Sequence, residues 1–467
     1  MRIYYFLYSI FTISFSTLPS YAQVYLDSTV LQTDIVADKL DTPWEIIWGP
    51  DDWLWVTERE GRVIRIHPET GETKQILQLT NVYRFQAAGL LGMALHPNFS
   101  DTAQVFIVYT YNDGEKAKEK IVRYTYQNDV LVKPLVLIDN IPAATIRNGS
   151  RLITTPDRKV IMTTGDINQP KLAQNINSLN GKTLRVNFDG SVPEDNPIPG
   201  SYIWSWGHRN PQGLVLADNG ILYSSEHADS SDDELNIIEK GRNYGWIDVQ
   251  GYCDTPEEKA YCNNYQIKEA ISAWTPSIAP CGLEYYNHDA IPEWKNALLL
   301  TTLKHDDLRV LKLTEDGQSI VSENIYFDNR FGRLRDVCVA PNGDLYVATS
   351  NRHDTKANSG FPIPSDDKII RISVSTAPRY ASEKNIVKVF PNPFNTFTTI
   401  QVDGKYSKGS KNLRFQIYDR LGQTIQEVVL PSQQVAQISK DSHQPGVYFY
   451  RLLDGNQIVD SGRFLIN

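Results

Sequence analysis

The chain has 467 residues, which is too long for one ordinary domain of roughly 100–200 residues. With 41% hydrophobic and 22% charged residues the composition is that of a globular protein, which excludes a disordered or membrane-embedded chain. The formal charge of −9 argues against a nucleic-acid-binding surface, which usually carries a basic excess. The 25 Tyr, 9 Trp, 28 Gly and 25 Pro favour strands joined by tight turns, and therefore an all-β fold.

The N-terminus has the pattern of a signal peptide over residues 1–22. Arg2 precedes an apolar stretch from Ile3 to Leu18, and small residues at Ser20 and Ala22 predict cleavage before Gln23. A membrane anchor is the alternative interpretation of the same stretch. No later segment approaches the roughly 20 apolar residues of a membrane span, so we expect no transmembrane segment in the mature chain.

One hairpin pattern recurs along residues 30–374. An apolar strand is followed by a polar turn and by a second strand that ends near Thr or Ser. Copies occur at residues 46–57, 95–110, 152–164, 216–225, 283–302 and 339–349. Repeats of 47 to 70 residues with about four strands each are typical of a β-propeller, and six repeats predict six blades. A pair of stacked sandwiches is the rival architecture, although it would not explain the repeated hairpin.

Four cysteines lie beyond the predicted signal peptide, and an even number in an exported protein suggests disulfides. Cys253 and Cys262 are nine positions apart in one loop and are expected to form a local bridge. Cys281 and Cys338 would then pair over a distance or stay free. The spacings do not match a C-x-x-C zinc site.

The repeat ends near residue 374. Residues 375–386 are expected to be a linker, and the short alternating strands of 387–467 predict a small β-sandwich. Its motifs are Val389-Phe390-Pro391-Asn392-Pro393, Tyr418-Asp419-Arg420-Leu421-Gly422 and Pro445-Gly446-Val447-Tyr448. On these motifs the segment resembles the C-terminal sorting domain of type IX secretion substrates, which implies recognition by that machinery and passage through the periplasm to the cell surface or the medium. A carbohydrate-binding sandwich is the alternative.

Three long motifs of the propeller segment lie at residues 89–99, 206–214 and 225–246. In this order they resemble the soluble PQQ-dependent glucose and aldose sugar dehydrogenases, also called glucose/sorbosone dehydrogenases, over about residues 35–374. The resemblance implies a secreted quinoprotein that uses PQQ and calcium to oxidise an aldose sugar to its lactone. It also implies that electrons pass to an external acceptor.

The resemblance assigns cofactor contacts to Arg209, Lys304, Arg333 and Arg335, with the Asn210 amide beside the first. PQQ is a planar quinone with three carboxylates, so its site needs several cations, and Arg suits carboxylates because of its two-pronged geometry. Arg333 and Arg335 are two residues apart, so on a strand they would face the same side. A solvated basic strand edge is the alternative explanation of that pair.

The resemblance also implies calcium. Glu234 and Tyr244 occupy positions that help to bind a structural calcium in the family, and the carbonyls of Ala228 and Asp229 occupy positions that face the calcium beside PQQ. The family's Gly-Pro is replaced by Ala228-Asp229, which keeps the carbonyls and loses the proline. Oxygen ligands suit calcium, but an ordinary acidic turn would have the same sequence.

The family's catalytic base, a histidine, is replaced by Arg147 in the run Ile146-Arg147-Asn148-Gly149. A guanidinium with a pKa above about 12 cannot accept the hydroxyl proton of a sugar. Three alternatives follow. His227 is a substitute base, Arg147 binds an anionic substrate or holds the cofactor without ordinary turnover, or the alignment is shifted in this loop. The rival function is therefore a catalytically impaired propeller that binds a sugar or a protein. A propeller glycosidase, with Asp166, Glu226 and Asp232 as carboxylate candidates, is a further possibility.

Overall fold

The computed structural model describes residues 23–352, 360–375, 387–402, 413–419, 423–430, 435–440, 443–455 and 457–467. The predicted signal peptide at 1–22 lies outside these residues, as does the predicted linker except for Ser375. The chain divides into two compact units between Val374 and Ser375. Among the described residues, the search for a helix long and apolar enough to cross a membrane found none.

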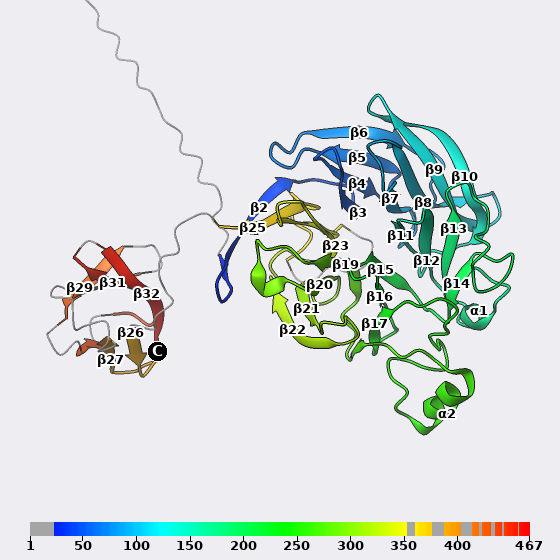
Figure 1. Cartoon of the computed structure of the whole chain (residues 1–467). Coiled ribbons are helices and arrows are strands. Elements are labelled where there is room, and N and C mark those ends of the chain that lie inside the picture. The colour runs from blue at the N-terminus through cyan, green and yellow to red at the C-terminus, as the bar shows by residue number, and fades with distance from the viewer. Residues whose placement is uncertain are drawn as a thin grey trace, which may run out of the picture. The chain divides into compact units, whose positions relative to one another are not determined.

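The described strands of the first unit form six small antiparallel sheets, which Figure 1 shows around a common centre. The first sheet contains β3 (Pro43–Trp48), β4 (Leu54–Glu58), β5 (Arg62–Ile66) and β6 (Thr73–Gln78). The second sheet contains β7 (Leu90–Leu95), β8 (Gln104–Asn112), β9 (Ala117–Gln127) and β10 (Val130–Pro142). The third sheet contains β11 (Gly149–Thr154), β12 (Lys159–Thr164), β13 (Lys182–Asn187) and β14 (Ile203–Trp206). The fourth sheet contains β15 (Pro211–Leu216), β16 (Leu222–Glu226), β17 (Asp233–Ile237) and β18 (Ser272–Trp274). The fifth sheet contains β19 (Pro280–Tyr286), β20 (Ala297–Thr302), β21 (Leu308–Leu313) and β22 (Ile320–Tyr326). In each of these five sheets the strands follow one another in chain order.

The sixth sheet joins the two ends of the unit. It combines β23 (Leu334–Val339), β24 (Leu345–Thr349) and β25 (Ile369–Val374) with β2 (Val30–Ala37) and β1 (Val24–Tyr25). Strand β2 pairs antiparallel with β25, with Leu31 opposite Val374 and Ile35 opposite Ile370. A strand from the start of the described chain therefore completes the last sheet.

The first strands of the six sheets, β3, β7, β11, β15, β19 and β23, form a closed ring. Each contacts the next, and β23 contacts β3. Every predicted hairpin coincides with the first two strands of a sheet. Strands near the centre are buried on both faces, as β20 shows along its whole length, whereas the edge strand β22 is mostly exposed. The unit is therefore mainly β and has the predicted propeller-like arrangement.

Helical segments are short and few in the described chain. They are α1 (Lys171–Gln174), the 3-10 turn η1 (Pro292–Trp294) and α2 (Pro256–Tyr265). Helix α2 begins with a capping box, in which Thr255 and Glu258 each accept a hydrogen bond from the other's backbone. The predicted disulfide between Cys253 and Cys262 ties the preceding loop to this helix. Cys281 and Cys338 are both free and buried, which is the second of the two expected arrangements.

The second unit consists of two antiparallel sheets in its described part. One has the order β26 (Val387–Phe390), β27 (Phe397–Val402) and β30 (Val435–Ser439). The other has the order β29 (Thr424–Val429), β28 (Leu413–Tyr418), β31 (Gly446–Asp454) and β32 (Gln457–Ile466). One core cluster takes side chains from both sheets, including Ile400 and Ile438 from the first and Phe415 and Phe464 from the second.

Candidate active site

Nine of the eleven predicted site residues line one cavity of the first unit. The cavity has a volume of about 380 Å³ and lies where the inner strands begin. The predicted residues that line it are Arg147, Arg209, Asn210, His227, Ala228, Asp229, Lys304, Arg333 and Arg335. A larger cavity of about 630 Å³ borders the later residues of the same strands, and none of the predicted site residues lines it. The chemistry-bearing side chains therefore converge on the smaller cavity.

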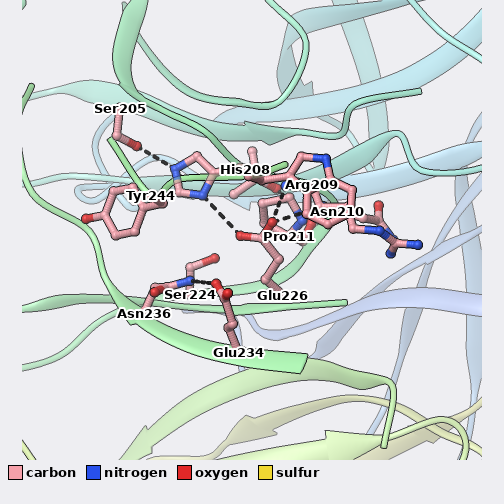
Figure 2. Close-up of polar contacts among 12 residues, drawn as sticks. Ser205, His208, Arg209, Asn210, Pro211, Ser224, Glu226, Glu234, Asn236 and Tyr244 are labelled. Atoms are coloured by element: carbon pink, nitrogen blue, oxygen red, sulfur yellow. Dashed lines mark hydrogen bonds and ion pairs between the residues drawn. The ribbon is translucent and has the colours of Figure 1, made fainter. Parts of the chain in front are cut away.

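The loop that carries Arg209 and Asn210 is held by the buried carboxylate of Glu226 on β16 (Figure 2). Glu226 Oε1 accepts hydrogen bonds from the backbone N–H groups of Arg209 and Asn210, the latter at 3.2 Å. Glu226 Oε2 lies 3.1 Å from His208 Nδ1, and His208 Nε2 lies 2.8 Å from Ser205 Oγ. The ring of His208 is fully buried, so its role is to support the loop.

Arg333 and Arg335 face the same cavity, as the two-residue spacing predicts. Arg335 Nη1 lies 3.3 Å from both Gln212 Oε1 and Cys281 Sγ, and Arg333 Nη1 donates to the Leu303 carbonyl at 2.9 Å. Burial, together with the positive charge of Arg335, lowers the pKa of Arg333 to about 10. Arg335 is buried and Arg333 is half-buried at the cavity, so the pair is not a solvated strand edge.

The cavity has the electrostatic character of an anion-binding site. Five cationic side chains line it, whereas Asp229 is the only carboxylate among its described lining residues. The Nε atoms of Arg209, Arg333 and Arg335 are buried and lack a hydrogen-bond partner within the described part of the chain. Buried donors normally have partners, so this donor set fits a ligand that carries several carboxylates.

Arg147 lies at the cavity on a loop with a left-handed backbone, where its φ is 60°. Its Nη1 lies 3.5 Å from Asp166 Oδ2, and its Nη2 lies 3.2 Å from Asp229 Oδ1. Asp166 is fully buried and also accepts a hydrogen bond from Trp246 Nε1 at 2.9 Å. A guanidinium is not deprotonated in proteins and offers no acceptor, so Arg147 does not act as a base.

His227 lines the same cavity as these cations. Burial, with the charges of Arg335 and Arg209, lowers the pKa of His227 to about 4, so the ring is neutral near pH 7. The ring also hydrogen-bonds to the backbone of Pro280. Its Nε2 is buried and has no hydrogen-bond partner in the described structure, which leaves this nitrogen as a possible proton acceptor.

Glu234 and Tyr244 do not line the cavity of about 380 Å³, and their polar groups have protein partners. Tyr244 packs on His208 with ring centroids 4.5 Å apart, and its hydroxyl donates to the Ile237 carbonyl. Glu234 accepts hydrogen bonds from Asn236 Nδ2 at 2.9 Å (Figure 2) and from the Gly251 N–H at 2.7 Å. Burial, with Glu226 opposite it on β16, raises the pKa of Glu234 to about 8.

The predicted calcium ligands lie at more than one place in the described structure. The search of the described residues found no group of three or more His, Cys, Asp or Glu side chains placed to hold a metal. Ala228 and Asp229 line the cavity, and Glu234 lines a small adjacent pocket with Ala228 and Glu226.

Three further residues of the site were not singled out as cofactor contacts from the sequence. Trp44 and Gln212 line the cavity, and Asp166, considered only as a glycosidase carboxylate, pairs with Arg147. Gln212 lies two residues beyond Asn210, and on a strand this spacing predicts that both side chains face the same side. The sequence carries no signal that Trp44 lines the cavity, because an aromatic residue at the start of a strand usually belongs to a core.

Comparisons with known proteins agree with this geometry. Residues 40–357 match the Glucose / Sorbosone dehydrogenase family, and residues 388–467 match the secretion system C-terminal sorting domain. Quinoprotein glucose dehydrogenase B of Acinetobacter calcoaceticus is 31% identical, over 70% of this chain and 87% of that protein. The aldose sugar dehydrogenase YliI of Escherichia coli is 30% identical, over 68% of this chain and 90% of that protein.

A solved structure supports the same assignment. The PQQ-bound form of the aldose sugar dehydrogenase from Streptomyces coelicolor superposes with a TM-score of 0.64 at 28% identity, over 74% of this chain and 98% of that chain. The sequence matches, the ring of sheets and the cationic cavity agree with one another. This chain belongs to the glucose/sorbosone dehydrogenase family and carries a C-terminal secretion sorting domain.

Proposed function

We propose that this protein is a secreted quinoprotein that oxidises an aldose sugar to its lactone with bound PQQ and passes the electrons to an external acceptor. The observation that carries the proposal is the convergence of five cationic side chains on one cavity with a single carboxylate. Family membership and the PQQ-bound relative from Streptomyces coelicolor support the same cofactor.

Arg209, Asn210, Lys304, Arg333 and Arg335 would hold the cofactor. The three orphaned Nε–H groups would donate to its carboxylates, since charge-assisted hydrogen bonds between guanidinium and carboxylate groups are among the strongest in proteins. Bound PQQ would supply a two-electron acceptor for the oxidation at the sugar C1. The Glu226 carboxylate would keep Arg209 and Asn210 in register with that acceptor.

The hydroxyl proton of the sugar would go to His227 Nε2, because the guanidinium of Arg147 cannot accept a proton. A cofactor carboxylate between Arg209 and Arg335 would offset the two charges that lower the pKa of His227. His227 would then accept a proton more readily in the loaded enzyme than in the cofactor-free protein.

Calcium stays a prediction from the family resemblance, at Glu234, Tyr244, Ala228 and Asp229. None of the steps above depends on it. A reconstitution with and without calcium decides whether the ion is required.

We propose that the ring of inner strands is the centre of a six-bladed propeller and that the second unit is a β-sandwich sorting domain. Closure between β23 and β3 supports six blades, and the core shared by the two sheets supports the sandwich. The matched sorting domain supports type IX export through the periplasm to the cell surface or the medium. A cleaved signal peptide over residues 1–22 would bring the chain to that pathway.

Reconstitution tests the proposed activity. The full chain is incubated with PQQ, with and without calcium, and the reduction of an electron-accepting dye is followed for a panel of aldoses and uronic acids. We expect dye reduction that depends on both PQQ and a sugar, and its loss in His227→Gln with PQQ still bound. Tight PQQ binding by the wild-type protein without turnover of any sugar would instead support the binding-module alternative.

Replacing Glu226 tests whether its carboxylate positions two of the predicted PQQ contacts. Replacing Glu226 by Gln removes the charge that fixes the backbone N–H groups of Arg209 and Asn210. Hydrogen bonds to a charged acceptor contribute about 1.5–3 kcal/mol, roughly twice the value for neutral pairs. We expect PQQ affinity to fall about tenfold, measured by equilibrium titration. An unchanged affinity would show that Glu226 does not position the loop.

A further inference from the structure

Arg147 differs from the other cations of the cavity in its position. Its side chain is 17% exposed, compared with 6% for Arg209. The loop that presents it is fixed, because the Ile167 N–H donates to the Arg147 carbonyl at 3.1 Å. A Cβ atom on Gly165 would lie 1.9 Å from that carbonyl oxygen, so the chain packs tightly behind the loop. The guanidinium is therefore presented to the cavity by a rigid backbone.

A carboxylate of the protein itself already lies between Arg147 and Arg209. Asp229 Oδ1 is 3.2 Å from Arg147 Nη2 and 2.8 Å from Arg209 Nη2. The Asp229 side chain is 70% exposed, whereas Asp166, the other partner of Arg147, is fully buried. Asp166 thus orients the guanidinium, and Asp229 is the partner that solvent or a ligand can replace. Exposed ion pairs contribute little to stability, so this exchange is easily reversed.

We propose that Arg147 and Arg209 form a subsite for the carboxylate of an acidic sugar, such as a uronic acid, and that Asp229 occupies this subsite when substrate is absent. The inference rests on the proposed function and names its substrate class. Arg147 is then a specificity-determining residue, in which a guanidinium binds the acidic group of the substrate at the position where the family has its histidine.

The balance of charges supports a second anion in addition to the cofactor. Arg209, Lys304, Arg333 and Arg335 are the cations assigned to the three carboxylates of PQQ. Arg147 is not one of these four cations, and it pairs with the buried Asp166 and with the exposed Asp229, which also accepts from Arg209 Nη2. The contact of Asp229 shows which ligand group the subsite accepts. Its Oδ1, a carboxylate oxygen, lies within 3.2 Å of both guanidinium groups.

Steady-state kinetics with the PQQ-loaded full chain test the proposal. D-glucuronate and D-galacturonate are compared with D-glucose, D-galactose and D-glucose 6-phosphate. For the uronates we expect a KM at least tenfold below that of the neutral sugars. Arg147→Gln should raise the uronate KM about 10- to 30-fold with a much smaller change in kcat, and Arg147→Lys should restore part of the loss.

Asp229→Asn provides a readout that a purely structural role would not give. Because Asp229 competes for the subsite, its neutral replacement should lower the uronate KM several-fold. Asp129→Asn is the matched control: Asp129 is 60% exposed and pairs with Arg65, which also binds Asp51, and none of the three lines the cavity. This control should leave the uronate KM unchanged.

Binding of D-glucuronate to the PQQ-free protein, measured by calorimetry, separates this inference from the proposed function. We expect binding by the wild-type chain that falls with added salt and is lost in Arg147→Gln. A wild-type chain that binds glucuronate but reduces no dye with PQQ would contradict the proposed oxidoreductase activity and leave the carboxylate subsite standing. Equal KM values for uronates and neutral sugars, a preference for the phosphate ester, or an unchanged uronate KM in Asp229→Asn would overturn the subsite.

Discussion

Replacing Arg335 by Gln is expected to weaken PQQ binding by on the order of 100-fold. Arg335 is buried at the cavity, and its Nε has no hydrogen-bond partner in the described structure. A guanidinium that donates to a carboxylate away from water contributes roughly 1.5–3 kcal/mol, and about 1.4 kcal/mol is a tenfold change in affinity. Equilibrium titration of PQQ into the purified full chain measures the effect.

Arg371→Gln is the matched control for this substitution. It removes the same charge, but Arg371 pairs with Asp344 and Glu69 and does not line the cavity. We expect its PQQ affinity to stay within twofold of the wild-type value. If both variants lost affinity equally, the effect would come from net charge and not from a donor at the cavity.

Replacing Glu119 by Gln is expected to stabilise the protein at pH 8 by several kcal/mol and to have little effect near pH 5. Glu119 on β9 is almost fully buried and accepts a hydrogen bond from Ser150, close to the loop of Arg147. Burial raises the pKa of its carboxyl from 4.5 to about 8. At about 1.4 kcal/mol per pH unit, this rise corresponds to roughly 5 kcal/mol between the two protonation states.

The direction of this pH dependence follows from the affinity of Glu119 for its proton in the folded and unfolded states. The folded state holds the Glu119 proton more tightly than the unfolded state, so the contribution is complete below pH 4.5 and is lost as the pH rises towards 8. Glutamine is neutral at every pH and escapes this loss. Denaturant unfolding at pH 5, 6.5 and 8 should give a stability difference that grows with pH. A difference that stays constant would show that the carboxyl is ionised throughout this range.

Local features of the fold could be predicted from the sequence. The turn Pro341-Asn342-Gly343 joins β23 to β24 as the hairpin pattern predicts, with Gly343 at a φ of 85° that favours glycine. The disulfide between Cys253 and Cys262 could be predicted because the two cysteines are nine positions apart in the sequence, and their Cα atoms are 6.4 Å apart. In both cases the signal and the contact lie within one short stretch of chain.

Contacts between distant segments could not be predicted in the same way. The pairing of β2 with β25 joins strands more than 300 residues apart, and neither strand carries a signal for its partner. Arg147 and Asp229 are separated by 82 residues, so only the fold shows that their side chains contact each other. The family resemblance supplied the cavity residues, and the structure supplied their partners.

Titration of PQQ into the cofactor-free protein, with dye reduction measured on the same samples, tests the central claim most directly. We predict saturable binding of one PQQ per chain, weakened by salt and by Arg335→Gln, and sugar-dependent dye reduction that rises in step with occupancy. Absence of saturable binding in the wild-type chain would contradict the assignment of this cationic cavity as a quinone site.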